Sequence, residues 1–175
     1  NGFVTGLLGA STYAAMDHLL HRQAAPTTMD DLMPLNSAAK AEKVICGPMV
    51  AGNLSLLNIG VKDSWELEAE GRIVLVEDVN EKPHVIARTL KYLQRVGVLS
   101  SPAALILGDF TVATASVVAA PQGDAVLPVL REFAASCEYP VFCSQHVGHG
   151  EQNVPIPFDV TATLTVGSDQ SSLVF

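Results

Sequence analysis

The run Ile73-Val74-Leu75-Val76 limits the possible folds more than any other feature, because it is uninterruptedly aliphatic and ends abruptly at Glu77-Asp78. A strand with apolar side chains at every position is usually buried on both faces, as in a sheet that helices cover. A second run of this kind, Ala104 to Leu107, ends at Gly108-Asp109. These runs alternate with amphipathic segments, which is typical of an α/β domain.

A helix is expected after the first aliphatic strand. Asn80 could cap it, Pro83 suits its first turn, and Gly97 suits its C-terminal end. Between Pro83 and Gly97, apolar residues recur with helical spacing on one side of the expected helix, and basic residues occupy the other side. The basic side is most simply a solvated helix surface.

The remaining elements follow in the same alternating order. A second helix is expected from about residue 124 to 137, and a short strand over 140–144. A polar loop rich in Gly and His comes next. Two final strands over 160–166 and 172–175 are separated by Gly-Ser-Asp-Gln, which favours a hairpin.

The domain organisation divides the chain near residue 43. Residues 1–42 are mixed in character and are expected to be an interdomain segment or remnant, whereas residues 43–175 form the domain. A chain of 175 residues can bury one sizeable core. The chain also lacks an initiator Met, which suggests that it is a piece of a longer protein.

Composition excludes two classes of partner. Ten Lys and Arg against 18 Asp and Glu give a formal net charge of −8, and no basic cluster is present for a nucleic-acid backbone or an anionic membrane surface. No apolar window reaches the roughly 18–20 residues of a spanning helix, and no signal peptide is evident. Neither nucleic acid nor a membrane is therefore an expected partner.

Three cysteines, Cys46, Cys137 and Cys143, are an odd number without a Cys-x-x-Cys pair. Free thiols in a reducing cytoplasm are the simplest interpretation. A disulfide between Cys137 and Cys143 stays open.

Glu77 and Asp78 are the first candidates for chemistry, because side chains at the end of a buried strand are held firmly beside a loop that opens toward a ligand. The alternative is structural: one acid caps the next helix and the other is solvated.

The second candidate is His149, which two glycines flank in the segment 146–151. Glycine permits a tight loop that presents the imidazole, and a neutral His is the usual general base at neutral pH. Two alternatives remain. His149 could be an ordinary surface-loop residue, or His146, His149 and Glu151 could hold zinc.

Several familiar signatures are missing. The chain has no Gly-x-Ser-x-Gly nucleophile elbow, no phosphate loop and no dinucleotide fingerprint. We therefore expect no cofactor and no resident metal, and the sequence identifies no nucleophile.

Six short pieces of the sequence can be considered together: 51–57 (AGNLSLL), 73–81 (IVLVEDVNE), 83–99, 105–110 (LILGDF), Pro140-Val141, and 148–150 (GHG) with Asn153 and Pro157. In this order they resemble the C-terminal half of the LD-carboxypeptidase family, the serine peptidases of murein recycling that include the microcin C immunity peptidases. The resemblance extends from about residue 44 to the end of the chain.

The resemblance implies a swivelling β/β/α type of fold and a Ser–Glu–His triad in which Glu77 supplies the acid and His149 the base. It further implies hydrolysis of the bond before a C-terminal D-alanine in murein tetrapeptides. The nucleophilic Ser would come from an N-terminal domain absent from this chain, which alone should then be inactive. A cytoplasmic homodimer is also implied.

Three departures from the family pattern concern the substrate: Ala51 replaces a glycine, Ala87 an acid, and Phe158-Asp159 a Leu-Gly-like pair. A related peptidase that acts on a microcin-like amide is therefore an alternative. A non-catalytic module that binds peptide or dimerises is another.

Overall fold

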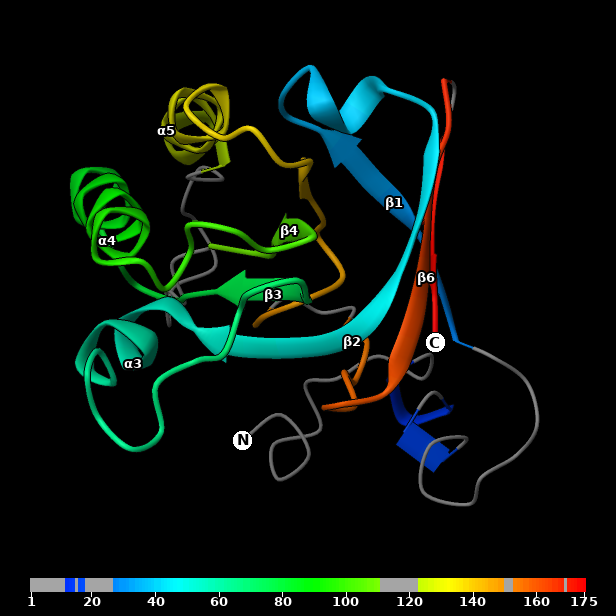
Figure 1. Ribbon diagram of the computed structural model, residues 1–175, viewed down its shortest axis with the longest axis horizontal. Coiled ribbons are helices and arrows are strands. Elements are labelled where there is room, and N and C mark those ends of the chain that lie inside the picture. The colour runs from blue at the N-terminus through cyan, green and yellow to red at the C-terminus, as the bar shows by residue number, and fades with distance from the viewer. Residues whose placement is uncertain (1–11, 15, 18–26, 111–122, 150–152, 169) are drawn as a thin grey trace, which may run out of the picture.

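The computed structural model describes residues 12–14, 16–17, 27–110, 123–149, 153–168 and 170–175 (Figure 1). The expected α/β class is confirmed. The elements, in chain order, are β1 (Thr28–Pro34), the 3-10 helix η1 (Ala38–Lys40), β2 (Lys43–Asn53), α3 (Leu54–Ile59), β3 (Ile73–Glu77), α4 (Pro83–Val96), β4 (Ala104–Leu107), α5 (Gly123–Ala135), β5 (Val141–Cys143), β6 (Thr161–Val166) and β7 (Ser171–Val174).

The strands close into a barrel in the order β1-β5-β4-β3-β2-β6-β7. The pairs β2–β3, β3–β4 and β4–β5 are parallel, whereas the remaining pairs are antiparallel, and β6 with β7 forms the expected hairpin. Figure 1 shows α3, α4 and α5 beside the parallel strands, away from β6. The helices therefore cover one side of the parallel part.

The long strand β2 belongs to both parts of the barrel. Its first half, Lys43 to Pro48, pairs antiparallel with β6, and its second half, Met49 to Asn53, pairs parallel with β3. The strand bends between the two partners in Figure 1. This bend carries Asn53 to the end of β3.

The aliphatic strands are buried on both faces, as their sequence predicts. In β3, Val74 and Val76 pack into the core under the helices, whereas Ile73 and Leu75 point to a second core with Met49. Successive strand residues point to opposite faces, so one run of four residues serves both cores.

The helix after β3 matches its expected bounds closely, but its expected cap is wrong. Lys82 occupies the N-cap position without a side-chain cap bond, and Pro83 begins α4. Asn80 instead adopts a positive φ of 64° in the preceding turn, a conformation that asparagine tolerates better than most residues. Gly97 ends the helix in a left-handed conformation, as expected.

The barrel also includes β1, which lies within the segment 1–42. It pairs with β7 through Thr28 to Leu32 and with β5 through Met33 and Pro34, so it closes the ring.

Cys46, Cys137 and Cys143 are all free thiols. Within the described ranges, no helix has the length and apolarity needed to cross a membrane.

Candidate functional site

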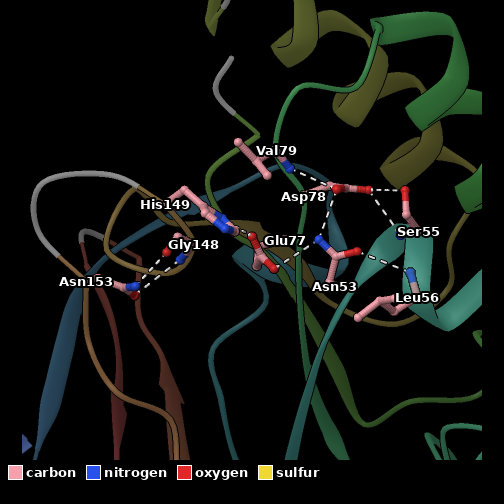
Figure 2. A network of polar contacts seen from close by, with 9 residues as sticks. All are labelled: Asn53, Ser55, Leu56, Glu77, Asp78, Val79, Gly148, His149 and Asn153. Atoms are coloured by element: carbon pink, nitrogen blue, oxygen red, sulfur yellow. Dashed lines mark hydrogen bonds and ion pairs between the residues drawn. The ribbon is translucent and has the colours of Figure 1, made fainter. Parts of the chain in front are cut away.

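The candidate site lies at the carboxyl end of β3. β2 and β3 are parallel, and their register places Asn53 directly beside Glu77. Because parallel strands end at the same edge of a sheet, the polar residues that end them gather there. Figure 2 shows Glu77 between His149 on one side and Asn53 on the other.

The structure brings the two predicted site residues together, although they are 72 positions apart in sequence. His149 Nδ1 lies 2.8 Å from Glu77 Oε2. The Glu77 side chain is 17% exposed and that of His149 is 50% exposed, so a fixed carboxylate meets an accessible ring. The carboxylate accepts a hydrogen bond from Nδ1–H, and in this tautomer Nε2 carries the lone pair that can take a proton.

The backbone beside His149 is held from two directions. Gly148 has a φ of +131°, which favours glycine, and its N–H and carbonyl both bond to the Asn153 side chain. The carbonyl of Val147 accepts a hydrogen bond from the Asp109 N–H, which follows β4. The loop is therefore tied to the same sheet edge as Glu77.

The beginning of this loop is fixed by Asp31 of β1. Its carboxylate accepts bonds of 2.8–2.9 Å from the Ser144 hydroxyl and one of 2.8 Å from the Gln145 N–H. Its Oδ1 also lies 3.6 Å from Nδ1 of His146. The structure thus places His146 beside Asp31, while His149 is beside Glu77.

Asp78 is buried, with 4% of its surface exposed, and it is not solvated as one alternative supposed. Its carboxylate accepts hydrogen bonds from the N–H and hydroxyl of Ser55, the N–H of Val79 and the side-chain amide of Asn53. Asp78 therefore supports the first turn of α3, the helix before it in the chain, and not α4.

A cavity of about 310 Å³ opens beside Glu77 and His149. Its wall combines these two polar groups with small and apolar side chains from β2 and from the segment after the His149 loop. The lining residues are Thr12, Met16, Ala51, Gly52, Asn53, Glu77, Val147, Gly148, His149, Asn153, Val154, Pro155, Ile156 and Phe158. A small ligand could therefore contact Glu77 and His149 from this cavity.

The zinc alternative receives no support from the described residues. Glu151 lies outside them, and they contain no cluster of three or more His, Cys, Asp or Glu side chains that could hold a metal.

Reasoning from the sequence missed the residues that hold the site. Asn53 and Asn153 stand within or beside the motif pieces, but nothing local shows that Asn53 meets Glu77 or that Asn153 binds Gly148. Nothing in the sequence around Asp31 indicates its role, because its hydrogen-bond partners lie 113 or more residues away.

The family model for the LD-carboxypeptidase C-terminal domain matches residues 46–164. A Rickettsia conorii relative that carries the name of a carboxypeptidase is 31% identical over 87% of this chain and 45% of its own length. The murein tetrapeptide carboxypeptidase of Pseudomonas aeruginosa is 28% identical over 78% of this chain and 43% of its own length. The chain thus spans less than half the length of these curated relatives.

Solved structures share the fold. The muramoyltetrapeptide carboxypeptidase from Oxalobacter formigenes superposes with a TM-score of 0.75 at 24% identity, over 95% of this chain and 55% of that one. A structure of the microcin C7 self-immunity protein MccF gives a TM-score of 0.69 at 18% identity, over 93% and 54% of the two chains. The swivelling β/β/α-type C-terminal fold is confirmed by this likeness.

Proposed function

Because the chain belongs to the LD-carboxypeptidase family, we propose that it is the C-terminal half of a serine carboxypeptidase that releases a C-terminal D-amino acid from murein tetrapeptides. The observation that carries this proposal is the 2.8 Å contact between His149 and Glu77 beside the cavity. A carboxylate–imidazole pair with a free Nε2 is the acid–base half of a hydrolytic triad.

The Ser nucleophile comes, in this proposal, from a domain that precedes this chain in the full-length protein. Two described serines near the site already have other partners, since Ser55 bonds to Asp78 and Ser144 to Asp31. We place the connection to the nucleophile domain before Thr28, where β1 begins.

His149 moves the proton through both halves of the reaction. Nε2 takes the Ser proton as the Ser oxygen attacks the carbonyl carbon of the scissile amide, and Glu77 stabilises the imidazolium that forms. The C–N bond then breaks, and His149 gives the proton to the leaving amine of the D-amino acid. Water hydrolyses the acyl-enzyme with His149 again acting as the base.

The substrate is proposed to be murein-like, because the relatives that sequence comparison detects include a protein named for murein tetrapeptide. A microcin-like amide is the second candidate, since MccF shares the fold. Phe158 lines the cavity and is 65% exposed, so its side chain is available to contact a substrate and to distinguish the two substrate classes.

The test is release of D-alanine from a murein tetrapeptide by the full-length protein. Glu77→Gln and His149→Ala are each expected to lower kcat by roughly 10³-fold or more. His146→Ala is the matched control, because this neighbouring histidine lies beside Asp31 and should leave kcat nearly unchanged. Full activity in both site variants would contradict the proposal, and activity lost on chelation would favour the metal alternative.

We also propose that the full-length protein is a cytoplasmic homodimer. Free thiols agree with a reducing compartment, and the exposed side chains of Leu56, Ile59 and Trp65 offer an apolar surface for association. Cell fractionation and light scattering measure the two properties, and a periplasmic or monomeric protein would overturn them.

A further inference from the structure

The Asn53 side chain joins three parts of the site through one amide group. Its Nδ2 lies 3.3 Å from Glu77 Oε1 and 2.9 Å from Asp78 Oδ1, while its Oδ1 accepts the Leu56 N–H at 3.1 Å (Figure 2). Glu77 Oε2 is left to His149. The two oxygens of the Glu77 carboxylate therefore have different partners.

The orientation of this amide follows from its surroundings. Two carboxylate oxygens can only accept from Nδ2, and the backbone N–H of Leu56 can only donate to Oδ1. A flipped amide would place oxygen against two carboxylates and nitrogen against an N–H. Only one orientation therefore satisfies all three contacts.

Asp78 holds this amide in place in turn. The buried Asp78 carboxylate accepts two hydrogen bonds from Ser55 and one from the Val79 N–H, in addition to the one from Asn53. A buried carboxylate with this many donors is firmly oriented. Asn53 is thus fixed by the helix α3 at one end and by Asp78 at the other.

We propose that Asn53 is a positioning residue: its amide orients the Glu77 carboxylate toward His149 and separates it from the Asp78 carboxylate. The inference rests on the proposed function, in which Glu77 and His149 act as a pair. Asn53 acts through Glu77 and performs no chemistry of its own.

The charge around the amide gives this role a measurable consequence. Glu77 and Asp78 at the end of β3 contact the amide, His149 contacts Glu77 from its loop, and Asp109, which follows β4, lies against Gly148 beside His149. Without the N–H, two carboxylates face each other with no donor between them. Their repulsion favours protonation of the Glu77–His149 pair.

The experiment compares Asn53→Ser and Asn53→Asp in the full-length protein, with a murein tetrapeptide as substrate. Ser and Asp are both good N-cap residues, so each keeps an acceptor for α3. Ser replaces the two N–H donors of the amide with a single hydroxyl donor, which can serve only one of the two carboxylates, and Asp supplies no donor. In Asn53→Ser, kcat should fall roughly 10- to 100-fold with KM changed less than about twofold, as for other residues that orient a reacting group. In the profile of kcat/KM against pH, the rise on the acidic side (the acidic limb) should move to higher pH. The shift should be larger in Asn53→Asp, because that substitution adds a negative charge.

Asn36→Ser is the matched control. The Asn36 amide makes a comparable set of bonds elsewhere, donating to the carbonyls of Ala134, Cys137 and Tyr139 and accepting from two backbone N–H groups. Its loss should lower stability without moving the acidic limb.

The outcomes separate the two proposals. If Glu77→Gln abolishes activity but Asn53→Ser leaves kcat and the limb unchanged, the positioning role alone is wrong. A raised KM with an unmoved limb would make Asn53 a substrate-binding residue and also overturn the role. If Glu77→Gln retains activity, the proposed function fails and the positioning role fails with it.

Discussion

Gly108 determines how closely the His149 loop approaches β3. A Cβ atom at this position would lie 2.5 Å from the carbonyl oxygen of Val147 and 3.1 Å from Cβ of Glu77. The first of these atoms belongs to the backbone, so it cannot move aside as a flexible side chain can. A side chain at position 108 would therefore push the loop that bears His149 away from Glu77.

Gly108→Ala should accordingly reduce both activity and stability. We expect a loss of about 1–3 kcal/mol in the free energy of unfolding, as for other overpacked sites. A displacement of His149 by about 1 Å could lower kcat about 100-fold. Both quantities are measured on the full-length protein by chemical unfolding and D-alanine release.

Gly71→Ala is the control for this substitution. Gly71 has a φ of +67° but open space around its missing Cβ, so it carries the backbone penalty without the clash. It should lose stability and keep its kcat. Equal loss of kcat in both variants would contradict the assigned role of Gly108.

Glu77 and His149, which we propose as the acid–base pair, are predicted from local pattern and family resemblance. The residues that hold them are not. Asn53 meets the two acids across 24 and 25 positions, and the contact exists only because β2 and β3 pair in one particular register. Register depends on the whole barrel, so a reading of neighbouring residues does not reveal it.

Among the elements, α4 has a buried apolar face and an exposed basic face. Ile86, Leu90 and Leu93 are fully buried against the parallel strands, whereas Arg88 and Lys91 are exposed. Lys91 also pairs with Glu132 of α5, whose pKa the lysine lowers through a hydrogen bond and its charge. Such an exposed pair contributes little to stability, so the buried residues stabilise the helix.

Leu90→Ala should therefore lower the free energy of unfolding by about 2–5 kcal/mol, because it removes buried methyl groups and leaves a cavity. Arg88→Ala, two residues away on the exposed side, should change it by less than about 0.5 kcal/mol. Urea unfolding measures both. Similar effects from the two substitutions would mean that α4 is not packed as described.

The elements that the sequence predicts well are those with one environment along their length. β3 and β4 lie wholly between two cores, and α4 has one buried face. β2 was not predicted because it pairs with two different partners, and its burial pattern changes at the bend. β1 was missed because its short stretch carries two adjacent acids and a proline and becomes a strand only when β5 and β7 are beside it.

For the whole molecule, the buried Cys137 thiol and the half-buried Cys143 thiol make the free energy of unfolding depend on pH in the alkaline range. Burial, together with the nearby Asp31 charge, raises the pKa of Cys143 to about 11, and burial likewise raises the pKa values of Cys137 and Tyr139. An unfolded cysteine loses its proton near pH 9. Between about pH 9 and 11 the folded state therefore retains protons that the unfolded state releases, so stability falls as pH rises.

The measurement is the free energy of unfolding across that pH range, in the unmodified protein and in Cys143→Ala. The variant loses some stability at every pH, because a half-buried group is removed. Its decline between about pH 9 and 11 should nevertheless be shallower. Parallel curves for the two proteins would show that Cys143 does not contribute to the decline.

The closed order of the strands has a consequence for peptide recognition. Each strand of the barrel is hydrogen-bonded, at least in part, to a neighbour on both sides. Among the described strands, β3 and β4 are paired on both sides along nearly their whole length. An extended peptide therefore finds no free edge there on which to dock by β-augmentation, a mode in which main-chain bonds supply affinity for almost any sequence. Under the proposed function, recognition at the ends of β3 and β4 therefore comes from side chains around the cavity, which respond to the chirality and shape of a residue and not only to its backbone.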